Sequence, residues 1–554
     1  MAVAFEALKV CETLEGILKG TFGPNGLDVL LNSSSGDILI TNSGALILRS
    51  LNLENRIGQT IVDKVASFCG ITGDGSTSFI LLLTALLREV INHTRIKANI
   101  NGVEISSSQG QSLFALSRAF FKLETTLLEV VIPVLNNIAI TTPVGVENLS
   151  LIKHKINRLI TTALNEKFPI NIVTLFTQLL CDLVTKTWNS SAISLKESVL
   201  LMVDEFSQIC IEVPGIPISS SQIKPGILIP RQFATDLEEI SSTPLNFKFV
   251  VINCSVDFSG PQTSSSIQIK DQISLDTSLQ WKRNQVQKVI TMFQQHNIRL
   301  ILASENVSDL VLHFCRQYDI AVVSMIPQEC TEYICKCTGV LPIDNLDSEN
   351  LSELFKGTGI SCGIQKVGQR KAVSLQVDPS NVKFIPHYLL LCSPVQGLCK
   401  QYCIALHNAL KCVKMSFNAD GRNLLFLPGG GGAEFAVSFS LKAFAQTVSD
   451  SNLSLAVKIL SNALQTIPWT LHQNSFSMSH EKGSFVHCLT EVERSLKNNS
   501  VMLGIDYKTG KPMDSAKLEI YEPLSGKYVL LQSLLQCLSQ LLRTEKFIGV
   551  KTVI

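Results

Sequence analysis

Six consecutive residues, GDGSTS at residues 73–78, have side chains and backbone freedom suited to a metal-bound phosphate. The two glycines let the chain turn sharply and approach a ligand, and the Asp74 carboxylate is a ligand that Mg²⁺ accepts. The three hydroxylic residues open an apolar run that predicts a helix, whose first amides attract anions. A capped turn before a core helix would use the same residues, so this segment alone leaves both interpretations open.

Two other glycine turns raise the same question. One is TFGPNG at residues 21–26, and the other is the run of four glycines at residues 429–432, which follows the apolar residues 424–427. A helix is expected to open directly after this run, at Ala433 and Glu434. Each turn by itself could be a helix cap, so only the arrangement of the three turns along the chain can favour a phosphate site over helix caps.

Length and charge limit the classes of protein to consider. A chain of 554 residues exceeds what one hydrophobic core usually serves, so two to four domains are expected. The 47 basic and 46 acidic residues balance to a net charge of +1, which gives no electrostatic reason to expect a nucleic acid or an anionic membrane as a partner. Charged residues make up 17% of the chain, which indicates either surface buried in partners or a large core.

Cysteine usage and the N-terminal residues indicate a soluble intracellular protein. The 16 cysteines include no C-x-x-C pair, and Cys335 with Cys337 lacks the second pair that a zinc site needs. Buried reduced thiols explain them best. The opening residues MAVAFEALKV show neither a basic region nor a cleavage site, and no apolar run is long enough to span a membrane.

The first 150 residues predict mostly helix. An apolar face formed by Val10, Leu14, Ile17 and Leu18 predicts a first helix that ends near Gly20. A hairpin follows, with strands at 29–31 and 37–41 and a turn between them. Further helices are expected over three ranges: 57–69, 76–92 and 110–136.

The character of the sequence changes from about residue 213. Strands are expected at 247–254, 298–302 and 320–323, and apolar stripes at 286–293 and 307–314 predict a helix between each pair. This alternation predicts an α/β domain with parallel strands. Helices return after about residue 390, and leucines from 531 to 542 form a thick apolar stripe. We therefore expect the two helical ends to pack into one discontinuous domain.

The order and spacing of these motifs resemble those of group II chaperonins over essentially the whole chain. The motifs are TFGPNGLD at 21–28, TNSGALIL at 41–48, GDGSTS at 73–78, KPGIL at 224–228, PGGGG at 428–432, GID at 504–506, EP at 522–523, Lys527 and FIGV at 547–550. The resemblance implies a multidomain α/β fold with a helical equatorial domain, an intermediate hinge domain and an α/β apical domain. The implied domains are equatorial 1–145 and 416–554, intermediate 146–212 and 376–415, and apical 213–375.

The same resemblance implies ATP and Mg²⁺ as cofactors, bound in the equatorial domain. Asp74 would be the metal ligand, and Gly430 and Glu522 would lie near the ribose. The residues carried over as nucleotide-binding are Gly23, Pro24, Asn42, Gly73, Asp74, Gly75, Ser76, Thr77, Ser78, Gly430 and Glu522.

Two positions depart from the family's pattern where carboxylates are expected. Typical members read T-N-D-G-A where this chain has Ser43, and H-D-A-L where it has Asn408. Hydrolysis needs carboxylates to polarise the attacking water, and a hydroxyl or an amide is no useful base at neutral pH. Losing one positioned general base lowers the rate by about 10² to 10⁴. Nucleotide binding with weak or absent hydrolysis is therefore the leading hypothesis. No catalytic residue is assigned.

Divergence of this kind resembles the Bardet-Biedl syndrome chaperonin-like branch, to which the segment FIPHYLLLCSPVQG at residues 384–397 is also similar. The branch implies a chaperone that helps to assemble a ciliary trafficking complex. It also implies three kinds of partner: sister chaperonin-like proteins, cytosolic chaperonin subunits and client subunits of that complex. The implied location is the cytoplasm, with the centrosome, basal body or cilium.

Two enzyme readings compete with this hypothesis. An ATP-hydrolysing foldase would need a substitute base, for which His407 and Asp28 are the nearest candidates. A histidine on a helix face and a turn residue explain them more simply. A small-molecule kinase using the 429–432 loop is disfavoured, because no acceptor-activating Asp motif lies near it. The segment 271–279, where the family has a lid-forming helical protrusion, also lacks the usual acidic pattern, and Ser and Gln dominate from 262 to 280. A closing lid is therefore in doubt.

Overall fold

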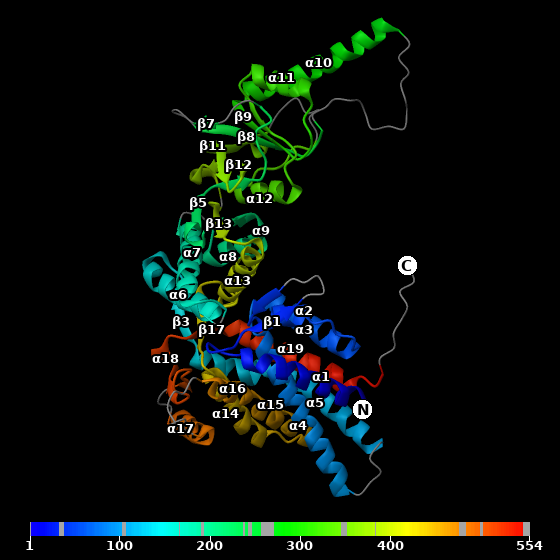
Figure 1. Ribbon diagram of the computed structural model, residues 1–554, viewed down its shortest axis with the longest axis vertical. Helices are drawn as coiled ribbons and strands as arrows, with labels where there is room; N and C mark the ends of the chain where they lie inside the picture. Colours follow the sequence, from blue (N-terminus) through cyan, green and yellow to red (C-terminus); the bar gives the residue numbers. More distant parts are fainter. Residues whose placement is uncertain are drawn as a thin grey trace. The chain divides into compact units, whose positions relative to one another are not determined.

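The computed structural model shows a chain of helices and small sheets (Figure 1). The described residues are 2–32, 38–101, 107–165, 167–189, 193–235, 239–241, 246–255, 271–344, 352–382, 384–475, 484–498 and 502–546. Within these ranges, none of the helices combines the length and the apolar character that a membrane crossing requires. All 16 cysteines are free thiols, and each is buried or partly buried, as the sequence predicts.

The chain divides into two compact units. The first consists of Met1–Gln178 with Ala405–Ile554, and the second of Leu179–Ile404. The first unit is therefore built from both ends of the chain. The finer division into equatorial, intermediate and apical segments stays a prediction.

Long helices dominate the first unit, and the helices of the two chain ends pack against one another. The C-terminal helix α19 lies against α5 and α3, and α14 and α15 pack against α5 (Figure 1). Residues 79–83 of α4 are at most 1% exposed, so the apolar run that follows the GDGSTS motif is the centre of this core. The helices are α1 (Ala2–Leu18), α2 (Gly44–Ser50), α3 (Arg56–Thr72), α4 (Ser76–Asn101), α5 (Ser107–Ile138), α6 (Leu149–Asn165), α14 (Gly432–Thr447), α15 (Ser451–Leu464), α16 (Thr466–Asn474), α17 (Phe485–Lys497), α18 (Ser515–Leu518) and α19 (Leu524–Arg543).

Short strands of the first unit position the glycine loops. In one antiparallel sheet, β14 lies between β3 and β17, so the glycine run that follows β14 is held beside the residues of β17. The other two sheets are the hairpins β1–β2 and β15–β16. The strands are β1 (Val29–Asn32), β2 (Ile38–Thr41), β3 (Ile140–Pro143), β14 (Asn423–Pro428), β15 (Leu503–Ile505), β16 (Pro512–Asp514) and β17 (Tyr521–Pro523).

The second unit contains the α/β arrangement that the sequence predicts. β8 and β9 are parallel, as are β9 and β10, with α10 and α11 as the connections. A seven-stranded sheet has the order β10-β9-β8-β11-β12-β6, with β7 also paired to β11, and a second sheet has the order β4-β13-β5. Its elements are α8 (Leu195–Asp204), α9 (Phe206–Ile209), β4 (Cys210–Pro214), β5 (Gln222–Pro225), β6 (Ile227–Ile229), β7 (Glu239–Ser241), β8 (Phe247–Ile252), α10 (Gln272–Gln295), β9 (Ile298–Ala303), α11 (Asp309–Gln317), β10 (Ala321–Val323), α12 (Gln328–Thr338), β11 (Gly357–Val367), β12 (Arg370–Val377) and β13 (His387–Ser393).

Helices α7 (Ile170–Asn189) and α13 (Gln396–Lys414) each belong partly to both units. The predicted hairpin forms, but its turn at 33–37 lies outside the described residues. Residues 262–270 of the Ser- and Gln-rich segment and the FIGV motif also lie outside them. Residues 272–280 are helical, as part of α10. Pro133 does not end a helix but lies inside α5, because the apolar face continues to Ile138 and its packing outweighs the lost hydrogen bond.

Candidate functional site

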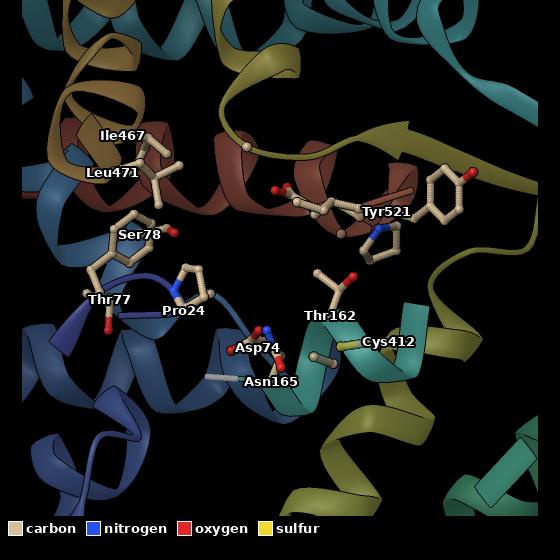
Figure 2. A pocket seen from close by; sticks show the side chains of 18 of the residues that line it. Pro24, Asp74, Thr77, Ser78, Thr162, Asn165, Cys412, Ile467, Leu471 and Tyr521 are labelled. Atoms are coloured by element: carbon tan, nitrogen blue, oxygen red, sulfur yellow. The ribbon is translucent and has the colours of Figure 1, made fainter. Parts of the chain in front are cut away.

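A cavity of about 490 Å³ opens in the first unit, at the point where the three glycine turns meet (Figure 2). This volume is in the range of small-molecule sites. Ten of the eleven residues predicted to bind nucleotide line it, namely Pro24, Asn42, Gly73, Asp74, Gly75, Ser76, Thr77, Ser78, Gly430 and Glu522. Gly23 is not a lining residue and directly precedes Pro24.

The GDGSTS motif forms the turn between α3 and α4. α3 ends at Thr72, and Gly73 and Gly75 both have positive φ, at 82° and 96°. Two features require glycine at position 73: its positive φ, and the carbonyl oxygen of Asn408, which would lie 2.3 Å from an added Cβ. α4 then begins at Ser76, and its first three residues line the cavity, so the unpaired amides of a helix's first turn are available there to an anion.

Asp74 is the carboxylate beside these amides. Its side chain is 48% exposed, and its Oδ1 lies 3.6 Å from Nζ of Lys167. Among the described residues, no three His, Cys, Asp or Glu side chains gather closely enough to hold a metal by themselves. A half-exposed carboxylate beside anion-attracting amides fits an Mg²⁺ ion that takes most of its ligands from phosphate and water.

The two altered positions lie at the same end of the cavity. Ser43 lines it and precedes α2, and a Cβ added at the next residue, Gly44, would lie 2.4 Å from Oγ1 of Thr77. Asn408 lines it from α13, with its main-chain carbonyl against Gly73. Carboxylates at these two positions would lie beside the GDGSTS turn. His407 and Asp28, both within the described residues, do not line the cavity, so neither is placed to act as the substitute base.

The other end of the cavity is built around a buried ammonium. Lys527 Nζ lies 2.6 Å from Oε2 of Glu522 and also contacts Oε1 of Glu434, whose side chain is 2% exposed. Oε2 of Glu434 has no hydrogen-bond partner within the described part of the chain. Burial raises the pKa of Glu522 above its ordinary value, Lys527 opposes this shift, and the neighbouring Glu434 adds to it. The two carboxylates in turn raise the pKa of Lys527, which therefore stays charged.

Several lining residues were not predicted from the sequence. They include five polar residues from the second half of α6 and just beyond it: Arg158, Thr161, Thr162, Asn165 and Lys167. Figure 2 shows Thr162 and Asn165 on the same cavity as Asp74 and Cys412. The basic residues of 153–167 gave a weak signal, but a single sequence does not reveal which distant turn such a helix meets.

Comparisons with known proteins agree with this architecture. The sequence profile of the TCP-1/cpn60 chaperonin family matches residues 14–552. The chain is similar to the BBSome complex assembly protein BBS10 of Homo sapiens, with 26% identity over 420 residues, which cover 74% of this chain and 57% of that protein. It is also similar to thermosome subunit alpha of Thermoplasma acidophilum, with 21% identity covering 98% of this chain and 91% of that one. T-complex protein 1 subunit gamma of Schizosaccharomyces pombe is 22% identical, covering 98% and 94%. The matched region thus spans less than two thirds of the BBS10 relative.

Proposed function

We propose a function for this chain from its family, since it belongs to the TCP-1/cpn60 chaperonin family and has a multidomain α/β chaperonin fold. It is a chaperonin-like molecular chaperone that binds ATP with Mg²⁺ and hydrolyses it weakly or not at all. One observation carries the proposal: the cavity retains its phosphate-binding turns, whereas Ser43 and Asn408 stand at the same end where family members have carboxylates.

Binding is supported by groups that do not depend on side-chain identity. The backbone around Gly73 and Gly75 and the first turn of α4 supply the amides that hold phosphate. Asp74 would hold the Mg²⁺, which would neutralise phosphate charge, and Lys167 would add a cation beside it. Gly430 and Glu522 line the opposite end, where a carboxylate can accept hydrogen bonds from ribose hydroxyls.

Weak hydrolysis is supported by the side chains at the end of the cavity formed by the GDGSTS turn, which we call the phosphate end. Asp74 is the carboxylate of the predicted set that remains there, and it is already engaged with Lys167. The Ser43 hydroxyl and the Asn408 amide cannot take a proton from water at neutral pH. A site of this kind holds nucleotide as a structural ligand rather than consuming it rapidly.

We further propose that the chain helps to assemble the BBSome, a ciliary trafficking complex, in the cytoplasm and near the centrosome, basal body or cilium. The similarity to the BBSome complex assembly protein BBS10 supports this role. The proposed partners are sister chaperonin-like proteins, cytosolic chaperonin subunits and BBSome subunits. Leu30 and Ile40, which pair across the β1–β2 hairpin, are 61% and 58% exposed and offer an apolar surface for such a partner.

Binding and turnover can be measured separately on the same protein. A fluorescent ATP analogue should bind in the presence of Mg²⁺, and Asp74→Ala should weaken that binding. Release of phosphate should be far slower than for a ring chaperonin assayed in parallel. Turnover close to that of the ring chaperonin and abolished by Asp74→Ala would overturn the proposal, as would a failure to bind nucleotide.

A further inference from the structure

Glu519 has a backbone conformation that normally belongs to glycine. It directly follows the short helix α18 and has a φ of 51°, in the left-handed region where a helix usually ends on glycine. Four non-glycine residues of the described ranges have positive φ, and two of them, Asn297 and Asp319, are types that tolerate it. Glu519 does not belong to those types and lines the cavity. A residue kept in such a conformation suggests that its side chain is needed there.

The Glu519 carboxylate contacts two basic residues of α6. Its Oε2 lies 2.7 Å from Nη2 of Arg158 and 3.7 Å from Nε2 of His154. Beside it, Nζ of Lys155 donates to the Tyr521 hydroxyl at 2.5 Å and lies 4.3 Å above the Tyr521 ring. α6 is thus attached to the segment that leads into β17, on which Glu522 lies.

The far end of α6 reaches the phosphate turn. Thr161, Thr162 and Asn165 line the cavity, and Lys167, two residues beyond the helix, pairs with Asp74. Figure 2 shows this helix end on the cavity beside Asp74. The middle of α6 is therefore tied to one cavity wall through Glu519 and Tyr521, and the segment after its C-terminal end to another through Lys167.

We propose that Glu519 is a positioning residue that fastens α6 along the cavity and thereby slows the release of bound nucleotide. This inference rests on the proposed nucleotide binding. The Arg158 and Glu519 side chains are 46% and 32% exposed, so solvent weakens their pairing. The left-handed backbone at Glu519 costs a free energy of similar size. Replacing Glu519 by glycine removes both effects, so the cavity opens more readily while the fold keeps its stability.

Two variants separate the carboxylate from the strain. Glu519→Gln keeps the strained backbone and loses the ion pairs, so its melting temperature falls. Glu519→Gly loses both, so its melting temperature stays equal to that of the wild type or rises. Both should release a fluorescent ADP analogue about 3 to 10 times faster than the wild type, as expected for the loss of about 1 kcal/mol. Lys442→Met, which removes the exposed pair with Glu493 elsewhere in the first unit, should leave release unchanged.

Cysteines in the cavity give a readout that needs no nucleotide. Cys69 and Cys412 line it, and burial raises the pKa of each thiol to about 12, so they react with N-ethylmaleimide only when the cavity opens. Peptide mass spectrometry should show both labelled 3 to 10 times faster in Glu519→Gln, Glu519→Gly and Arg158→Met. Cys537, buried in α19 away from the cavity, should be labelled at the wild-type rate.

The outcomes distinguish the two proposals. If the wild type binds no nucleotide, the proposed function fails, and the thiol rates still decide the role of Glu519. If labelling of Cys69 and Cys412 is unchanged in all three variants, the positioning role is overturned. It is also overturned if Cys537 accelerates equally, because the variants would then loosen the whole unit rather than the cavity.

Discussion

The two ends of the cavity are built on different physical principles. At the phosphate end, the groups that would bind are backbone amides shaped by Gly73 and Gly75, and the groups that would catalyse are side chains. At the other end, which we call the ribose end because Gly430 and Glu522 would contact the ribose there, the Lys527 ammonium and the carboxylates of Glu434 and Glu522 form the wall. A single side-chain change removes a general base without disturbing an amide, so the phosphate end can lose catalysis and keep binding. The ribose end has no such separation, because Glu522, the carboxylate that would contact the ribose, is also one of the two that pair with Lys527.

The largest effect is expected at the ribose end. Lys527→Met leaves the buried Glu434 carboxylate and the partly exposed Glu522 carboxylate without their cation, which should lower the free energy of unfolding by about 3 to 5 kcal/mol, mainly through Glu434. Thermal unfolding measures the loss. Lys442→Met, which removes a pair whose side chains are about 40% exposed, should change it by less than about 1 kcal/mol.

The pH dependence of this variant has a definite sign. Burial already raises the pKa of Glu522, and Lys527 opposes that shift. Without Lys527 the folded-state pKa of Glu522 rises further above its value in the unfolded chain. The variant therefore loses stability as the pH rises from the unfolded-state pKa through the folded-state pKa, and it regains stability on acidification. A destabilisation that stays constant between neutral pH and pH 5 would show that the wall does not depend on charge pairing.

Restoring the missing carboxylates tests the other end. Ser43→Asp combined with Asn408→Asp should raise ATP turnover about 10²-fold, the lower range for a positioned general base. The matched pair Ser43→Ala with Asn408→Ala, which adds no carboxylate, should leave turnover unchanged. No gain in the Asp pair, despite measured nucleotide binding, would place the defect outside these two side chains.

Adding one methyl group at Gly73 tests whether the backbone of the GDGSTS turn binds phosphate. Gly73→Ala forces a left-handed alanine and a Cβ 2.3 Å from the Asn408 carbonyl, so ATP affinity should fall about 10-fold to 100-fold. Gly70→Ala is the matched control in α3, because nothing lies within 4 Å of its added Cβ and alanine favours a helix. Equal affinities of the two variants, measured by calorimetry, would contradict binding at this turn.

The smallest effect concerns the cation at the phosphate end. Lys167→Met should weaken ATP binding about 5-fold, because a partly buried charge near phosphate contributes about 1 kcal/mol, and it should weaken ADP binding less. Lys167→Arg, which keeps the charge, should retain most of the affinity. Fluorescence titrations with both nucleotides would detect the difference, and equal losses for ATP and ADP would argue against contact with the terminal phosphate.

Much of the fold follows from short-range signals in the sequence. The apolar run after the GDGSTS motif predicts α4 and its burial, and the alternation after residue 247 predicts the parallel strands β8, β9 and β10. The glycine turns at the phosphate end could also be predicted from local sequence, because glycine is the residue type that most readily adopts a left-handed backbone. Glu519 violates that rule, so its left-handed conformation could not be foreseen. Arg158 and Lys167 were missed because their partners, Glu519 and Asp74, lie far away in the sequence, and no local periodicity reveals such a pairing.

The central claim is that this cavity holds ATP without cleaving it. A single-turnover experiment tests it most directly: protein in excess is mixed with radiolabelled ATP and Mg²⁺, bound nucleotide is isolated over time, and its phosphates are analysed by chromatography. We expect the bound nucleotide to be recovered as ATP long after a ring chaperonin has converted its own to ADP. Recovery as ADP on the time scale of the ring chaperonin, or no bound nucleotide at all, would contradict it.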